Sequence, residues 1–176
     1  MTFEVYWSVL GVRVSVHNNM NNASTVMFTG NVTHKLDPKS RVAIPAGWRA
    51  AQGQTLVMIA ACVEEKYRIM KCYTREAFAE KITHIREQAQ AHGAAPGDID
   101  NYVGRITGCS FEAEVSTQGK LLIPKAQRDR IGLKENATIV GRGAHFEIWA
   151  PEDFEATNTP EALNKLALDK LFHMLT

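Results

Sequence analysis

The sequence predicts an α+β protein built from two related units in tandem. The first observation is an internal repeat, in which residues 36–45 align with residues 115–124 at an offset of 79 positions. The same offset relates Arg49 to Arg128 and residues 67–69 to residues 146–148. The second observation is that each copy alternates short apolar runs with polar turns, whereas other segments show the apolar spacing of helices. With 176 residues, 45% of them hydrophobic, the chain can bury the core of one compact domain or two small units.

The first unit is predicted to span residues 27–95 and to open with a hairpin. Two extended runs, residues 31–36 and 41–44, flank a polar turn. The Asp37 carboxylate can accept bonds from nearby backbone N–H groups, and the Pro38 ring fixes a φ angle that suits the turn. After the hairpin, Pro45 marks the start of a short helix, and further strands are predicted at residues 55–60 and 67–72.

A longer helix over residues 75–91 is predicted to close the first unit. The Thr74 hydroxyl can cap its N-terminus. One helical face collects apolar side chains, namely Phe78, Ile82, Ile85 and Ala89. The stretch 92–97, which contains two glycines and a proline, then marks the boundary between the units.

The second unit is predicted to span residues 96–158 and to repeat the same plan. Its extended runs, residues 112–115 and 120–123, flank a turn in which Gly119 supplies the permissive backbone. Pro124 precedes a short helix over residues 125–131, and Gly132 is placed to cap its C-terminus. Strands are predicted at residues 138–141 and 146–149.

The two ends of the chain are predicted to lie outside these units. Residues 1–26 are interpreted as an N-terminal extension that is not part of the fold. Its apolar part, residues 1–16, is too short for a membrane span and lacks the basic start of a secretion signal. Residues 159–176 are predicted to form a C-terminal helix with one apolar stripe, made of Leu168, Leu171, Phe172 and Leu175. Such a stripe can pack on its own chain or on a neighbour, and the pattern favours neither.

The motifs of common enzymes and metal sites are missing from the sequence. The cysteines, at 62, 72 and 109, form no C-x-x-C pair, and the six histidines show no metal-binding spacing. No nucleophile elbow, Walker loop or dinucleotide fingerprint occurs, and Gly141-Arg142-Gly143 is better explained as a tight hairpin. The sequence therefore predicts a cytosolic binding protein with no catalytic residues, metal, cofactor or small-molecule substrate.

Basic side chains gather around the two predicted hairpins. The whole chain is nearly neutral, with 20 Lys and Arg against 19 Asp and Glu, so a site for a polyanion must arise by local clustering. Residues 27–49 hold four basic side chains against one acidic side chain, and residues 120–142 hold six against two. Lys35, Lys39 and Arg41 lie near the tip of the first hairpin.

A basic two-stranded ribbon fits the major groove of DNA. Arg41 can pair with guanine O6 and N7 through two hydrogen bonds, whereas Lys35 and Lys39 suit phosphates. On charge alone, a DNA-contacting hairpin and an ordinary solvated hairpin explain these residues equally well.

The motifs in this order resemble those of the MraZ family. Residues 27–30 and 36–45 are similar to the family's opening, while residues 118–124, Arg128-Asp129 and residues 146–149 are similar to its second half. The resemblance covers residues 27–158. It implies two tandem AbrB-like swapped-hairpin units that form a pseudo-dimeric β-barrel with flanking helices.

The resemblance also implies a function. Members of the family are transcriptional regulators that bind repeated sites upstream of their own gene and of the division and cell-wall gene cluster. It implies promoter DNA as the partner, a ring-shaped homo-oligomer, and a cytoplasmic, nucleoid-associated location with no membrane contact. The family signature D-x-x-x-R falls on Asp37 and Arg41, which makes Arg41 the expected DNA-contacting residue and Asp37 the residue that shapes the loop.

Three departures from the family pattern qualify this expectation. Ser40 stands where the family commonly has glycine, and Thr29 stands where it often has a basic residue. In the second hairpin Ser116 and Lys120 replace the Asp and Arg of the signature. Lys120 offers a point charge rather than a planar fork, so the second hairpin is expected to be structural or to contact phosphate. The alternative function is an antitoxin-like protein-interaction module whose C-terminal stripe holds a partner.

Overall fold

The computed structural model describes residues 26–48, 54–159 and 161. Almost all of the predicted extension, together with Arg49 and the apolar stripe of the predicted C-terminal helix, therefore lies outside the described residues. Val26, at the start of the described chain, is half-buried against the core.

The described residues form an α+β fold with eight strands and four α-helices. The strands are β1 (Asn31–Lys35), β2 (Arg41–Ala43), β3 (Thr55–Val63), β4 (Tyr67–Thr74), β5 (Ser110–Glu114), β6 (Lys120–Leu122), β7 (Asn136–Gly141) and β8 (His145–Trp149). The helices are α1 (Arg75–Ala91), α2 (Pro96–Gly108), α3 (Lys125–Arg130) and α4 (Pro151–Thr157), with a 3-10 turn at Ala46–Trp48. All eight strands overlap the extended segments predicted from the sequence.

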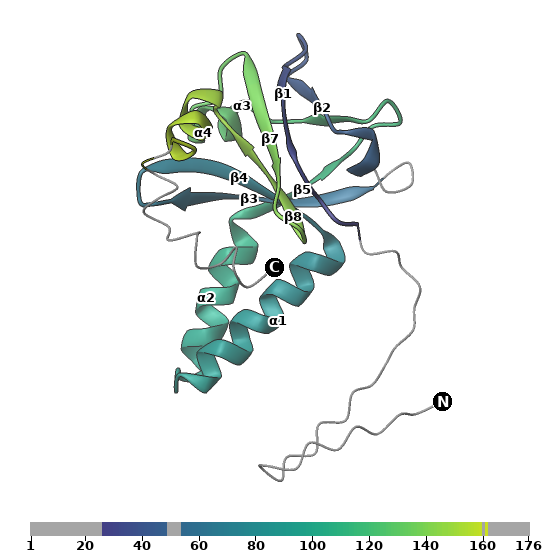
Figure 1. The fold of residues 1–176 in the computed structure, drawn as a ribbon. Coiled ribbons are helices and arrows are strands. Elements are labelled where there is room, and N and C mark those ends of the chain that lie inside the picture. The colour runs from purple at the N-terminus through teal and green to yellow at the C-terminus, as the bar shows by residue number, and fades with distance from the viewer. Residues whose placement is uncertain (1–25, 49–53, 160, 162–176) are drawn as a thin grey trace, which may run out of the picture.

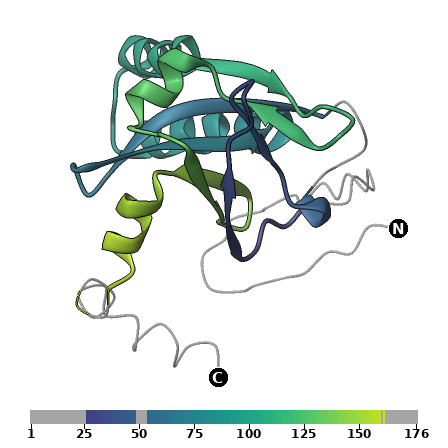
Figure 2. The same ribbon diagram turned by 90° about the horizontal axis from the view of Figure 1, so that it is seen from above.

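The strands form two antiparallel sheets. Six lie in the order β1-β7-β8-β4-β3-β5, and β2 pairs with β6 in a separate two-stranded ribbon (Figure 1). The six-stranded sheet is open, because β1 and β5 are its edges. The closed barrel that the family resemblance implies is therefore not formed by this sheet. Strands from the two halves of the chain are interleaved in the larger sheet, where β7 and β8 lie between β1 and β4 (Figure 2).

The internal repeat is visible in the strand pairing. β1 and β5 begin 79 residues apart, as do β2 and β6. Exchanging each strand of the larger sheet for its counterpart in the other unit gives the same order read backwards. The register is not fully symmetric. Asn31 pairs with Val140, so the 79-residue offset would pair Ser110 with Ala61, but Ser110 pairs with Ile59, two positions away. A shift of two residues keeps every side chain on its face of the sheet.

The main core lies between the ribbon and the larger sheet. Val42 of β2 and Leu121 of β6 are fully buried and point into it from the ribbon. Phe28, Trp48 and Phe146 form an aromatic cluster with ring centroids 5.3–5.7 Å apart. This packing fixes one face of the ribbon against the protein and leaves the other face outward.

The helices agree only partly with the sequence predictions. Helix α1 has the predicted bounds, and the Thr74 hydroxyl caps it by accepting a bond of 3.1 Å from the Ala77 N–H. Helix α2 begins within the stretch predicted as a link, and it projects beside α1 from one end of the sheet (Figure 1). Helix α4 was also not predicted, and its Phe154 packs edge-on against Trp149 at 5.9 Å. None of the described helices is long and apolar enough to cross a membrane.

Candidate nucleic-acid interface

Asp37 organises the tip of the first hairpin. Its carboxylate Oδ1 accepts hydrogen bonds from the backbone N–H groups of Lys39 at 2.9 Å and Arg41 at 3.0 Å. Its backbone N–H donates to the Arg41 carbonyl at 2.9 Å, and its carbonyl accepts from the Ser40 N–H at 2.8 Å. A side chain that accepts bonds from its own loop is the turn chemistry that Asp favours. Pro38, between these groups, is exposed.

The other carboxylate oxygen of Asp37 contacts two cations from different strands, Arg41 of β2 and Lys120 of β6. Oδ2 lies 2.9 Å from Arg41 Nε, 2.8 Å from Arg41 Nη2 and 3.2 Å from Lys120 Nζ. Side-chain exposure is 17% for Asp37, 29% for Arg41 and 35% for Lys120, so the cluster is half-buried. The bonds from the Arg41 side chain and backbone, aided by Lys120 and Lys39, hold the pKa of Asp37 well below its usual range. The carboxylate is therefore ionised at any physiological pH.

The second hairpin uses a hydroxyl where the first uses a carboxylate. Ser116 Oγ accepts a bond from the Lys120 backbone N–H at 3.1 Å, and the Ser116 carbonyl accepts from the Gly119 N–H at 2.7 Å. The hydroxyl thus supplies one of the bonds that Asp37 makes, but it cannot neutralise a cation. The Lys120 ammonium reaches across to Asp37 instead, and a single carboxylate serves both hairpins.

The turn position that precedes each cation has a left-handed backbone. Gly119 has φ +71°, and Ser40, at the equivalent position, has φ +60°. Ser40 therefore has a left-handed backbone without being a glycine. An L-residue is strained in this region, because its Cβ approaches the neighbouring carbonyl oxygen.

The remaining predicted cations lie apart from the Asp37 cluster. Lys35 is exposed, and its Nζ lies 3.5 Å from Glu135 Oε2, an exposed pair of little energetic weight. Lys39 is also exposed, and its ammonium has no partner among the described residues. The fold thus brings Arg41 and Lys120 together and leaves Lys35 and Lys39 as separate solvated charges.

A buried carboxylate that the sequence did not predict lies between β8 and its neighbours. Glu147 Oε2 accepts bonds from Arg142 Nε at 2.9 Å and Trp149 Nε1 at 3.0 Å, and Lys71 Nζ lies 3.8 Å from Oε1. Burial raises the pKa of Glu147, but the His145 imidazole, 3.6 Å away, and hydrogen bonds from Arg142 and Trp149 outweigh it and lower the pKa to about 2. The alternation of His145, Glu147 and Trp149 along β8 was the available signal, since these side chains share one face.

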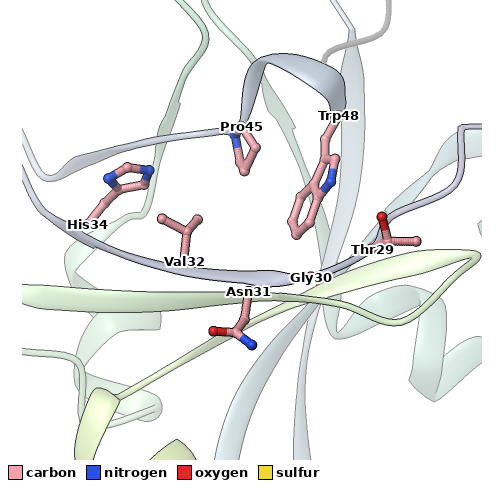
Figure 3. Close-up of a pocket in the computed structure, with 7 residues that line it drawn as sticks. All are labelled: Thr29, Gly30, Asn31, Val32, His34, Pro45 and Trp48. Carbon is pink, nitrogen blue, oxygen red and sulfur yellow. The ribbon is translucent and has the colours of Figure 1, made fainter.

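A shallow pocket of about 220 Å³ lies between β1 and the turn at Ala46–Trp48. Figure 3 shows Val32 and Pro45 pointing toward each other across it, with Trp48 and His34 at its two ends. The lining includes one ionisable side chain, His34. Within the described ranges, no group of three or more His, Cys, Asp or Glu side chains could hold a metal ion.

Two kinds of comparison with known proteins, the family model and the relatives, give the same family. Residues 108–167 match the family model described as "MraZ protein, putative antitoxin-like". The chain is 30% identical over 146 residues to the Transcriptional regulator MraZ of Ruegeria sp. (strain TM1040), covering 77% of this chain and 84% of that protein. It is 26% identical to the protein of that name from Leuconostoc citreum (strain KM20), covering 78% and 91%, and 28% identical to that from Oenococcus oeni (strain ATCC BAA-331 / PSU-1), covering 80% and 94%. The solution structure of PHS018 from Pyrococcus horikoshii gives a TM-score of 0.32 at 20% identity, covering 70% of this chain and 96% of that one.

Proposed function

This chain belongs to the MraZ family, and from that premise we propose that it is a sequence-specific DNA-binding transcriptional regulator that contacts DNA through its first hairpin. The observation that carries the proposal is the cluster in which Arg41 and Lys120, from opposite units, share the Asp37 carboxylate. Both cations belong to the two-stranded ribbon, whose inner face is fixed by the core. A rigid ribbon with cations on its outer face has the dimensions of a major-groove reader.

Arg41 is the residue proposed to read a base. Asp37 engages its Nε and Nη2, and a guanidinium has five N–H donors, so donors on both terminal nitrogens stay available. The carboxylate holds the guanidinium plane in one orientation, which reduces the entropy lost when Arg41 pairs with guanine. Asp37 therefore acts as a positioning residue for Arg41 as well as shaping the loop.

The lysines are proposed to contact phosphates and to fix the position of the hairpin. Lys35 and Lys39 are exposed on the first hairpin, and Lys120 adds a charge from the second. Such contacts set orientation without reading sequence. The loss of the Asp and Arg pair from the second hairpin, together with the use of Ser116 in its turn, supports a structural or phosphate-contacting role there.

The family premise extends the proposal to the site and the assembly. The proposed targets are tandem repeats upstream of the chain's own gene and of the division and cell-wall cluster. A ring-shaped homo-oligomer would present several hairpins to neighbouring repeats, and such multivalency raises avidity without new contacts. The proposed location is the cytoplasm, associated with the nucleoid, and the proposed role is binding rather than catalysis.

The architecture proposed for the chain is a pair of swapped-hairpin units, residues 27–95 and 96–158, in a pseudo-dimeric arrangement. Its support is that four strand pairs join the two units, namely β1 with β7, β2 with β6, β3 with β5 and β4 with β8. Among the eight named strands of the described residues, β3 with β4 and β7 with β8 are the pairs that lie within a unit. Residues 1–26 and 159–176 remain proposed as an extension and a terminal helix outside the units.

A DNA-binding assay with two arginine variants tests the proposed function. The probe is a labelled duplex from upstream of the chain's gene, titrated with the full-length protein at two salt concentrations. Arg41→Ala is expected to abolish the specific shift, whereas Arg86→Ala, which removes an arginine paired with Asp100 at 2.6 Å on the helical hairpin, should leave it unchanged. Equal binding by wild type and Arg41→Ala would refute the role of Arg41.

A second candidate function is an antitoxin-like protein-interaction module, which the description of the matching family model favours. The C-terminal stripe would then hold a partner protein. Co-purification of a stoichiometric partner that is lost on truncation near Thr159, without specific DNA binding by the intact chain, would support this alternative.

A further inference from the structure

The outer face of the ribbon carries four side chains in two rows. β2 and β6 pair in a register that sets Arg41 opposite Leu122 and Ala43 opposite Lys120. Residues directly opposite share a face, so all four lie on the side away from buried Val42. The face that presents Arg41 therefore also presents an apolar side chain.

Leu122 is unusually open for a large apolar residue. It is 48% exposed and is one of three large hydrophobic side chains exposed in the described part of the chain. Its counterpart 79 residues earlier is Ala43, so the two rows differ: one holds Arg and Leu, and the other holds Lys and Ala. The pair that contains the Arg41 guanidinium therefore also contains the larger apolar side chain, that of Leu122.

The pairing places Leu122 close beside Arg41. The Ile44 N–H donates to the Gly119 carbonyl at 2.8 Å, and the Ile123 N–H donates to the Ser40 carbonyl at 3.1 Å. These hydrogen-bonded pairs alternate with non-hydrogen-bonded pairs, so Arg41 and Leu122 form a pair of the second kind. Their Cα atoms are then about 4.5 Å apart and their side chains are at the closest spacing that a ladder allows.

We propose that Leu122 is a specificity-determining residue that contacts the C5-methyl group of a thymine beside the guanine read by Arg41. The inference rests on the proposed function and adds a second base to its readout. In the major groove, thymine presents a methyl group that cytosine lacks, and apolar side chains are the groups that recognise it. Leu is shorter than Arg, and the methyl group protrudes from the base edge, so a shorter side chain can reach it.

Single thymine-to-uracil replacements test this contact, because uracil lacks only the methyl group. The probe is the shortest upstream duplex that the full-length wild-type protein binds specifically, with each thymine replaced in turn. At one thymine, replacement should weaken wild-type binding by about fourfold, the value expected for one buried methyl group. Leu122→Ala should bind the unmodified duplex about as weakly, and the same replacement should then have no further effect.

Two control variants separate this contact from general effects. Leu122→Met keeps an apolar side chain and should keep the sensitivity to uracil, whereas Tyr102→Ala removes an exposed apolar group on α2 and should behave as wild type. Leu122→Ala should also leave the salt dependence of Kd unchanged, since it removes no phosphate contact.

The inference is overturned if every uracil replacement affects wild type and Leu122→Ala equally. It is also overturned if Leu122→Ala changes the oligomeric mass instead, because the residue would then contact a second copy of the chain. If Arg41→Ala abolishes specific binding in the same assay, the proposed function stands even when one of these two results overturns the role of Leu122. Absence of specific binding by wild type would overturn both.

Discussion

Replacing Ser40 by glycine is expected to stabilise the protein. Ser40 has φ +60°, a left-handed conformation in which the Cβ of an L-residue costs about 1–2 kcal/mol. Glycine has no Cβ and adopts this conformation freely. The second hairpin already has Gly119 at the equivalent position, with φ +71°. The first hairpin therefore carries a backbone strain that the second avoids.

Two opposing effects set the size of the gain. Removing the Cβ stabilises the folded state by about 1–2 kcal/mol. Glycine also makes the unfolded chain more flexible, which lowers the free energy of unfolding by about 0.4–1 kcal/mol. The backbone bonds of Ser40, donated to the Asp37 carbonyl and accepted from the Ile123 N–H, do not involve the side chain and should persist. The net stabilisation is then about 0.5–1 kcal/mol, which raises Tm by about 1–4 °C for a chain of this length.

Thermal unfolding of three proteins at one concentration measures this effect. Ser40→Gly should melt above wild type, and the reciprocal variant Gly119→Ser should melt below it, because it introduces the same strain into the second hairpin. Equal concentrations are needed because assembly shifts Tm. A lower Tm for Ser40→Gly would refute the assignment of strain to this turn.

Three further variants test other parts of the structure. Glu147→Ala should destabilise the fold by about 1–3 kcal/mol, because the buried Trp149 N–H and the Arg142 guanidinium lose their acceptor. Chemical denaturation measures the loss, and an unchanged free energy of unfolding would show that the carboxylate is dispensable. The lowered pKa of Glu147 stabilises the native state above its unfolded pKa near 4.5, and this contribution disappears as pH falls toward 2, so the acid-induced drop in Tm should be shallower in Glu147→Ala. Lys120→Met should reduce the slope of log Kd against log salt by about 0.9, the value of one phosphate contact, and should keep the sequence preference. Loss of the sequence preference would instead show that Lys120 contacts a base. Gly141→Ala should cost at least about 1–3 kcal/mol, since a Cβ there would lie 2.5 Å from the Phe28 backbone, and an unchanged Tm would contradict this close approach.

Local sequence patterns predicted the strands and the turn at Asp37 well. The two strands that flank this turn do not form a paired hairpin, however, because β1 pairs with β7 and β2 pairs with β6. The repeat located the equivalent strands, because turn residues and apolar runs recur at the same spacing in both copies. Helix α1 was predictable from the cap at Thr74 and a single apolar face. Helix α2 was missed because its three glycines lower helix propensity, although Ile99 and Val103 are spaced for one face and are buried.

Features that depend on long-range pairing were not predictable from one sequence. The Asp37–Lys120 contact joins residues 83 positions apart, and it requires the β2–β6 register. The sequence identified both residues but gave no reason to bring them together. Leu122 looked like an ordinary strand residue, and only the pairing places it on the outer face beside Arg41. Helix α4 was missed because the pattern of Pro151 followed by acidic residues spans less than three turns.

Substituting Arg41 by lysine tests most directly whether this side chain reads sequence. Lysine keeps the charge but loses the planar fork, so only base readout should suffer. The measurement is the ratio of Kd for a scrambled duplex to Kd for the upstream duplex, at one salt concentration. We predict that Arg41→Lys binds the scrambled duplex as wild type does, and that its ratio falls by about 5- to 150-fold, the value of one bidentate guanine contact. An unchanged ratio would contradict the assignment of sequence recognition to Arg41.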